Sequence, residues 1–179
     1  FVGFRLPSFF HNNVEFVRFQ NLEMLVDPLT GLGNRRRLQL YIDKLSRKRK
    51  GEFSAIVFDI DDFKDINDLY GHIYGDRILV IISKILEKSA GNKKITCIRY
   101  GGDEFIVITP KEEVDGFIAK FKELLNEFNS KKVFPRKVDI SIGVSEFTVN
   151  SEINMEYIIN TADKLMYEKK KLKKRNLKN

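Results

Sequence analysis

The sequence predicts an α/β fold, with a mixed central β-sheet flanked by helices, and three observations lead to this prediction. The run Phe53–Ile60 is short and almost entirely apolar, as expected of a strand buried on both faces. Two more apolar runs flank Gly101-Gly102, and a glycine pair between such runs indicates a tight hairpin. The segments between the runs carry apolar residues at three- and four-residue spacings, as amphipathic helices do. The resulting order of elements is not that of a doubly wound parallel sheet.

Helices are expected wherever the apolar residues follow this helical spacing. They run over Asn12–Val26, Arg35–Lys48, Phe63–Tyr70, Arg77–Lys88, Glu112–Phe128 and Met155–Lys173. The first ends at Asp27-Pro28, because proline disfavours the α conformation in the residue before it. Gly71 and Gly75 bracket a turn between the third and fourth helices, and Ser151 is a suitable N-cap for the last. The strands that complete the sheet are Lys94–Tyr100, Phe105–Thr109 and Lys137–Glu146.

Length and composition bound the class of protein. A chain of 179 residues, 42% apolar and 32% charged, suits one soluble domain with a short extension. Its single cysteine, Cys97, rules out an internal disulfide, and we interpret it as a reduced core thiol of a cytoplasmic protein. No run reaches the roughly 18 apolar residues that span a bilayer, and we find no secretory signal. The first residue is Phe1 rather than Met, so we expect the chain to be a piece of a longer protein.

Charge is distributed unevenly along the chain. The net charge is +7, and basic residues cluster in Lys44–Lys50 and Lys169–Lys178. Such clusters are usually solvated, but they also suit nucleic acid, anionic lipid or a polyphosphate substrate. Nucleic acid is disfavoured, because apart from Tyr167 no aromatic residues alternate with the basic ones. The two histidines, His11 and His72, are too few for a histidine-rich metal site, so a metal would have oxygen ligands, which favours magnesium or manganese.

The most informative stretch is Arg99–Ile108, in which Asp103 and Glu104 follow the glycine pair. Crowded carboxylates repel each other unless a cation lies between them, and a divalent metal with a phosphate ligand is a common solution. A solvated acidic hairpin tip is the alternative when this stretch is taken alone. Asp59 lies at the end of the first strand, so the three carboxylates converge if the two strands are neighbours.

Five blocks of sequence share one order and spacing with a known family. They are Asp27–Arg36, Ser54–Asp76, Arg99–Ile108, Asp139–Val144 and Ala162–Lys170. Together they closely resemble the GGDEF family of diguanylate cyclases, from about Asp27 to about Lys174. The resemblance implies a palm-like, ferredoxin-type sheet, shared with nucleotidyl cyclases and polymerases. It also implies a division into residues 1–26, an N-terminal extension with a signalling helix from an upstream region, and residues 27–179, the GGDEF catalytic domain.

The resemblance implies a metal site at the hairpin. Asp59, Asp103 and Glu104 would be metal ligands, assisted by the carbonyl of Ile60, and would hold two Mg²⁺ (or Mn²⁺) ions per active site. Two ions roughly 3.5–4 Å apart can grip the attacking and leaving oxygens of a phosphoryl transfer. Asp103 or Glu104 would also help take the proton from the attacking ribose 3′-hydroxyl. For Asp59 alone, capping of the next helix is an equally good reading.

Two residues match the positions that the family uses for guanine, Asn67 and Asp76. A carboxylate can accept hydrogen bonds from N1–H and the exocyclic amine of guanine, whereas adenine lacks this pair of donors. Sites built to bond a polar edge discriminate by roughly 10⁴ when that edge is missing. Taken alone, the two residues also suit an Asx turn and a helix N-cap. Gly71 and Gly75 are consistent with a base that approaches the backbone closely.

Other residues match the family's triphosphate contacts: Phe63 through its backbone, Lys64 and Lys170. The family usually continues with Gly-Arg-Asn-Arg, whereas this chain has Lys173-Lys174-Arg175-Asn176. A positive charge remains at Lys174, but the bidentate fork of arginine is lost there. We therefore expect weaker triphosphate binding with catalysis retained.

Many family members carry an Arg-x-x-Asp motif before the hairpin, through which the cyclic product inhibits the enzyme. The corresponding residues here are Asn92-Lys93-Lys94-Ile95, which lack both the Arg and the Asp. High-affinity product inhibition is therefore not expected.

The function expected from these features is a magnesium-dependent diguanylate cyclase that converts two GTP into cyclic di-3′,5′-guanylate and two pyrophosphates. One half-site cannot close the ring, so a homodimer is required, and the helix over Asn12–Val26 would link it to an upstream sensory domain. A non-enzymatic GTP-binding or interaction module is the alternative, favoured only by the altered residues after Lys170. A nucleic-acid binder rests only on the positive charge, so we expect no nucleic-acid partner.

Overall fold

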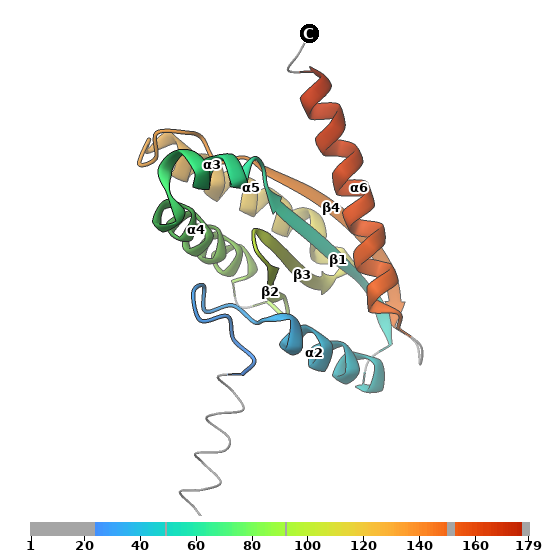
Figure 1. Cartoon of the computed structure of the whole chain (residues 1–179). Coiled ribbons are helices and arrows are strands. Elements are labelled where there is room, and N and C mark those ends of the chain that lie inside the picture. The colour runs from blue at the N-terminus through green and yellow to red at the C-terminus, as the bar shows by residue number, and fades with distance from the viewer. Residues whose placement is uncertain (1–23, 49, 92, 150–152, 177–179) are drawn as a thin grey trace, which may run out of the picture.

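The computed structural model describes residues 24–48, 50–91, 93–149 and 153–176. Four strands form one sheet in the order β2-β3-β1-β4 (Figure 1). They are β1 (Gly51–Ile60), β2 (Thr96–Gly101), β3 (Glu104–Pro110) and β4 (Ile140–Val149). All three pairs of neighbouring strands are antiparallel, so β1 and β2 run in one direction and β3 and β4 in the other. The one parallel pairing among the described residues is an isolated bridge between Gly33 and Ile98.

Helices cover both faces of the sheet, which confirms the predicted α/β class (Figure 1). They are α2 (Arg35–Lys48), α3 (Phe63–Tyr70), α4 (His72–Ala90), α5 (Val114–Ser130) and α6 (Met155–Asn176), with a 3₁₀ turn η1 (Lys111–Glu113) before α5. The strand order and the crossing helices correspond to the ferredoxin-like β-α-β-β-α-β arrangement.

Strand β1 forms the middle of two hydrophobic cores. Its residues Ile56, Phe58 and Ile60 pack with α3, α4 and α5. The alternate residues Ala55 and Val57 pack on the other face with α2 and α6. This alternation is the two-residue period of a strand, and it confirms the sequence-based prediction that this strand is buried on both faces.

Helix α4 begins at His72, not at Arg77 as predicted. The predicted turn between Gly71 and Gly75 is wrong, because Gly71 alone joins the two helices with φ 84° and ψ 158°. Gly75 lies inside α4.

Other predicted boundaries also shift. Of the predicted helix over residues 12–26, residues 12–23 lie outside the described residues, and Met24–Val26 form a turn and a bridge rather than a helix. Strand β4 begins at Ile140, not at Lys137, because the backbone N–H and C=O of Val138 bond to the side chain of Asn129. Ser151 lies outside the described residues, and the Asn154 side chain caps α6 by accepting a hydrogen bond from the backbone N–H of Tyr157.

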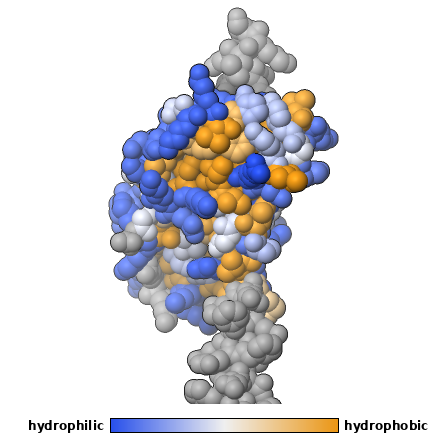
Figure 2. All heavy atoms as spheres, turned by 90° about the vertical axis from the view of Figure 1, so that its left-hand side faces the viewer, coloured by the Kyte–Doolittle hydropathy of each residue, from blue (hydrophilic) through white to orange (hydrophobic). Residues whose placement is uncertain are grey.

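The face formed by α3 and α4 exposes several apolar side chains among polar ones (Figure 2). Leu69 of α3 and Ile73 of α4 are exposed, and so is Val133 of the α5–β4 loop, which lines one cavity together with Ile73. None of the helices in the described ranges is long and apolar enough to cross a membrane. Cys97 on β2 is a free thiol, and burial together with the charge of Glu87 raises its pKa to about 12.

Candidate active site

The end of β1 and the β2–β3 hairpin form one acidic edge of the sheet. Asp59 lies directly opposite Glu104 in the β1–β3 register. Asp103 lies in the hairpin turn between Gly102, which has φ 48°, and Glu104. Side chains of directly opposed residues are close neighbours across a sheet. The two strands are therefore adjacent, as the convergence of the three carboxylates required.

A further carboxylate, that of Asp61, follows β1 on the side of β4. The Asp61 side chain is buried and accepts a hydrogen bond of 2.6 Å from the hydroxyl of Ser141. Ser141 is also the β4 residue opposite Asp59. Asp61 was not among the site residues predicted from the sequence, although its position two residues after Asp59 places it on the same side of the strand's end.

Lys170 of α6 brings a cation to this acidic edge. Its ammonium group contacts the carboxylate of Asp59 and lies 3.6 Å from that of Asp61. Burial lowers the pKa of Lys170, but the hydrogen bond from Lys170 to Asp59 and the neighbouring carboxylates raise it more, so the pKa lies above its usual value. The lysine predicted to contact triphosphate is thus positively charged and adjacent to the carboxylates.

The two hairpin acids are destabilised as anions. Burial raises the pKa of Asp103, and the charge of Asp59 raises it further. Burial likewise raises the pKa of Glu104, together with the charges of Asp163, Asp103 and Asp59. Lys170 offsets only part of this repulsion. Asp163, which lies on α6, is a contributor that the sequence-based prediction did not include.

These features suit a divalent cation. Carboxylate oxygens are the ligands that Mg²⁺ and Mn²⁺ prefer. Burial and, after it, the charges of neighbouring carboxylates raise the pKa of Asp103 and Glu104, and a bound cation would offset that repulsion. Among the described residues, no three acidic, histidine or cysteine side chains surround one point as a ready-made cluster. The donor chemistry fits a metal, and Lys170 is the cation in contact with Asp59 in this arrangement.

The hairpin is tied to the first described turn of the chain. Arg99 donates to the carboxylate of Asp27 at 3.1 Å and to the carbonyl of Gly102 at 2.8 Å. Asp27 also accepts hydrogen bonds from the backbone and hydroxyl of Thr30, at 2.9 and 2.6 Å. Arg99 therefore connects the Asp27–Thr30 turn to the backbone beside Asp103, a link that the sequence-based prediction missed.

The predicted phosphate contacts lie at the start of α3. Asp62 precedes the helix with φ 56° and makes no side-chain cap, and its carboxylate pairs with Arg136 at 2.7 Å. The first backbone N–H groups of a helix have no partner within the helix, so they suit a phosphate. Phe63 and Lys64 carry those groups, and the Lys64 side chain is exposed. Lys174 lies within α6, but its side chain is outside the described part.

The two predicted guanine contacts lie on either side of the α3–α4 junction. The Asn67 amide oxygen is buried and has no hydrogen-bond partner within the described chain. Asp76 is exposed, at the wall of a cavity of about 420 Å³ that also includes Leu29 and Phe134. The side chain of Asn67 lies in the space beside Gly75.

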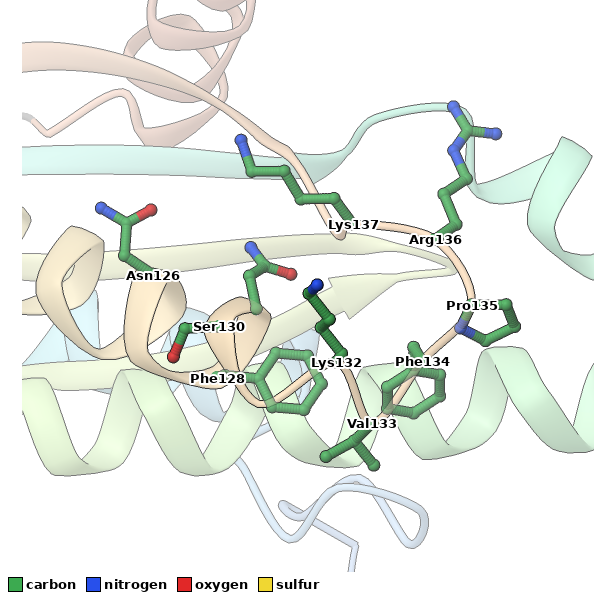
Figure 3. A pocket seen from close by; sticks show the side chains of 10 residues that line it. Asn126, Phe128, Ser130, Lys132, Val133, Phe134, Pro135, Arg136 and Lys137 are labelled. Atoms are coloured by element: carbon green, nitrogen blue, oxygen red, sulfur yellow. The ribbon is translucent and has the colours of Figure 1, made fainter.

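A separate cavity of about 620 Å³ lies where α5 leads into β4 (Figure 3). Its lining combines Phe128 and Phe134 with basic residues, among them Lys132 and Arg136. It includes none of the carboxylates described above. One of its lining residues, Arg136, forms an ion pair with Asp62 at the start of α3.

A ferredoxin-type antiparallel sheet with carboxylates at the end of β1 is the palm-like arrangement expected of nucleotidyl cyclases and polymerases. The match with family models identifies the member of this class. This chain belongs to the family "Diguanylate cyclase, GGDEF domain", whose model matches residues 24–176.

Curated relatives agree with this assignment. Diguanylate cyclase A of Treponema denticola is 36% identical over 135 residues, which cover 73% of this chain and 36% of that protein. Diguanylate cyclase VdcA of Vibrio cholerae is 36% identical over 156 residues, or 84% of this chain and 45% of that protein. The chain thus spans less than half the length of these relatives.

A solved structure gives the same fold. The coiled coil and GGDEF domain of DgcB from Caulobacter crescentus, in complex with c-di-GMP, superposes with a TM-score of 0.77. The match covers 90% of this chain and 88% of that one at 23% identity. This likeness supports the palm-like fold predicted from the sequence.

Proposed function

We propose that this chain is the catalytic domain of a diguanylate cyclase, which condenses two GTP molecules into cyclic di-3′,5′-guanylate and releases two pyrophosphates. The observation that carries the proposal is the acidic edge, where Asp59 faces Glu104 across β1 and β3 with Asp103 beside them. Membership of the GGDEF family and the named cyclase relatives support it.

Each half of the reaction needs a 3′-hydroxyl to lose a proton as it attacks an α-phosphorus. Asp103 or Glu104 would help take that proton, and burial with neighbouring charges raises the pKa of both carboxyls. Lys170, Lys174, Lys64 and the backbone of Phe63 would bind the triphosphate. Asn67 and Asp76 would bind the guanine base.

Cyclases of the GGDEF family are generally metal-dependent. In this chain, Asp59, Asp103, Glu104 and the Ile60 carbonyl would hold two Mg²⁺ or Mn²⁺ ions. When bound, such ions neutralise charge on the triphosphate and polarise the reacting phosphoryl group. The carboxylates would hold the ions, and Lys170 adds a further positive charge at the same edge of the sheet.

The reaction needs two copies of the domain. Each domain would bind one GTP, and each 3′-hydroxyl would attack the GTP held by the partner, so a single half-site cannot close the ring. We propose that residues 1–26 are an extension that links the catalytic domain, residues 27–179, to an upstream sensory region and sets the pairing of two domains.

The test is incubation of concentrated protein with GTP and Mg²⁺, with products separated by chromatography and ATP as the control nucleotide. We expect cyclic di-guanylate from GTP only, and none from the Asp103→Ala variant. Turnover of GTP at the wild-type rate by Asp103→Ala would overturn the assignment of the acidic edge. Binding of GTP without any product, even in a fusion that forces dimerisation, would overturn the cyclase activity.

A further inference from the structure

Gly75 of α4 lies against the Asn67 amide across the α3–α4 junction. A Cβ atom at position 75 would lie 2.0 Å from the Asn67 Oδ1 and 3.0 Å from its Cγ. It would also lie 3.1 Å from Cζ of Phe63. A Cβ essentially never approaches another heavy atom to 2.0 Å, so any side chain at position 75 requires a movement of Asn67.

The junction itself holds the two helices at this short separation. Gly71 is the single residue between α3 and α4. Its N–H donates to the Asn67 carbonyl at 2.8 Å, and its carbonyl accepts from the N–H of Gly75 at 3.3 Å. The backbone is thus fixed on both sides of the contact. The amide of Asn67 is the flexible group, so it is the group that a larger residue at position 75 would displace.

The Asn67 amide oxygen is buried and without a hydrogen-bond partner among the described residues. A buried polar atom without a partner is costly, and a functional role of the group is one explanation for such an atom. Gly75 is therefore a neighbour of both candidate guanine contacts. It packs on Asn67 in space, and it directly precedes Asp76 in the sequence.

We propose that Gly75 is a positioning residue for guanine binding, because the absence of a side chain at this position holds the Asn67 amide in the orientation that meets the base. This inference rests on the proposed function, in which Asn67 binds guanine. Gly75 contacts no substrate itself and acts only through Asn67.

The experiment compares four variants, Gly75→Ala, Asn67→Ala, the double variant and Gly116→Ala. Gly116 is the matched control, since it also lies inside a helix, α5, and a Cβ added there meets nothing within 4 Å. The measurements are KM and kcat for GTP, the affinity for a non-hydrolysable GTP analogue by calorimetry, and the melting temperature.

We expect Gly75→Ala to raise KM and weaken analogue binding about tenfold, which corresponds to about 1.4 kcal/mol, with kcat close to wild type. Gly116→Ala should leave both unchanged. The decisive comparison is the double variant. Once Asn67 is truncated, the closest clash of the added Cβ is removed and only the 3.1 Å contact with Phe63 Cζ remains. The double variant should therefore bind no more weakly than Asn67→Ala alone and should regain most of the stability that Gly75→Ala loses.

Wild-type binding by Gly75→Ala overturns the proposal, and so does a double variant in which the two losses add. Asn67→Ala tests the underlying assignment separately. If it binds the analogue as wild type does, then Asn67 does not bind guanine, and the proposed function and this inference both lose that residue. If Gly75→Ala alone fails to fold, the double variant still decides, because a contact with Asn67 predicts that folding is restored.

Discussion

Lys170 places a single positive charge among the carboxylates at the end of β1. Its ammonium contacts Asp59 and lies within 3.6 Å of Asp61, and its side chain is only 21% exposed. A charge-assisted hydrogen bond at such a site is worth about 1.5–3 kcal/mol. Lys170 stabilises the carboxylates, and in the proposed function it would also bind the triphosphate.

Lys170→Met should therefore raise KM for GTP by about tenfold to a hundredfold, because a cation of the proposed triphosphate site is lost. Steady-state kinetics and GTP-analogue calorimetry measure the effect. The matched control is Lys171→Met, since the neighbouring ammonium is directed to the ring of Tyr167 instead. An equal effect of the two substitutions would contradict a specific role for Lys170.

Asp27 is a residue whose charge contributes to stability. Burial raises its pKa, but hydrogen bonds from Thr30 and the hydrogen bond and charge of Arg99 lower it more, so the folded-state pKa lies below the usual 3.8. A carboxyl with a lowered pKa stabilises the fold above its unfolded-state pKa. That contribution is lost as the pH falls through the folded-state value.

Asp27→Asn should accordingly lower the free energy of unfolding at pH 7 by about 1–2 kcal/mol. The difference from wild type should shrink as the pH falls below 3.8 towards the lower folded-state pKa. Urea unfolding of both proteins, at neutral and acidic pH, measures this. A difference that stays constant across the two conditions would mean that the charge of Asp27 is not what stabilises the turn.

Helix α6 packs on the sheet through a second close contact at a glycine. A Cβ at Gly143 of β4 would lie 2.0 Å from the carbonyl oxygen of Ala162 and 2.8 Å from the backbone nitrogen of Met166. Both atoms belong to the backbone of α6, so the helix as a whole has to move to make room. Lys170 lies one turn beyond Met166 and would move with it.

Gly143→Ala should destabilise the protein by about 1–3 kcal/mol, as expected for overpacking, and should also reduce GTP turnover through Lys170. Thermal unfolding and activity are measured together, with Gly116→Ala as the control at an open position. Unchanged stability would show that α6 can shift freely on the sheet.

The sequence sufficed where a local pattern decided the structure. Helix α2 has the predicted bounds, and the apolar run around Phe58 became a strand buried on both faces. Prediction failed where a distant group decided it. Asn129 takes the backbone bonds of Val138 and delays β4, and Gly75 marks close packing inside a helix instead of a turn.

The same distinction applies to the site. The convergence of Asp59 with Glu104 followed from the hairpin motif and a single condition on strand adjacency, which the structure meets. The pair Asp27–Arg99 joins residues 72 positions apart, and no local spacing indicates it. Asp163 affects Glu104 only because α6 returns across the sheet.

Each domain presents one acidic edge and one α3–α4 junction. The proposed reaction uses two bound GTP molecules, so activity should depend on how much of the protein is paired. For a weak dimer, the paired fraction rises with concentration, and the rate per domain should rise with it until most of the protein is dimeric.

We therefore expect the specific activity of the isolated chain to fall as it is diluted, and that of a fusion with a dimeric coiled coil at its N-terminus to stay constant. Initial rates of cyclic di-guanylate formation across a dilution series, beside the mass from sedimentation, test both expectations. Mixing wild type with excess Asp103→Ala should also suppress the rate, because paired wild-type domains become rare. A rate per domain that is independent of dilution in a monomeric sample would show that one domain suffices, and the paired-domain mechanism would have to be abandoned.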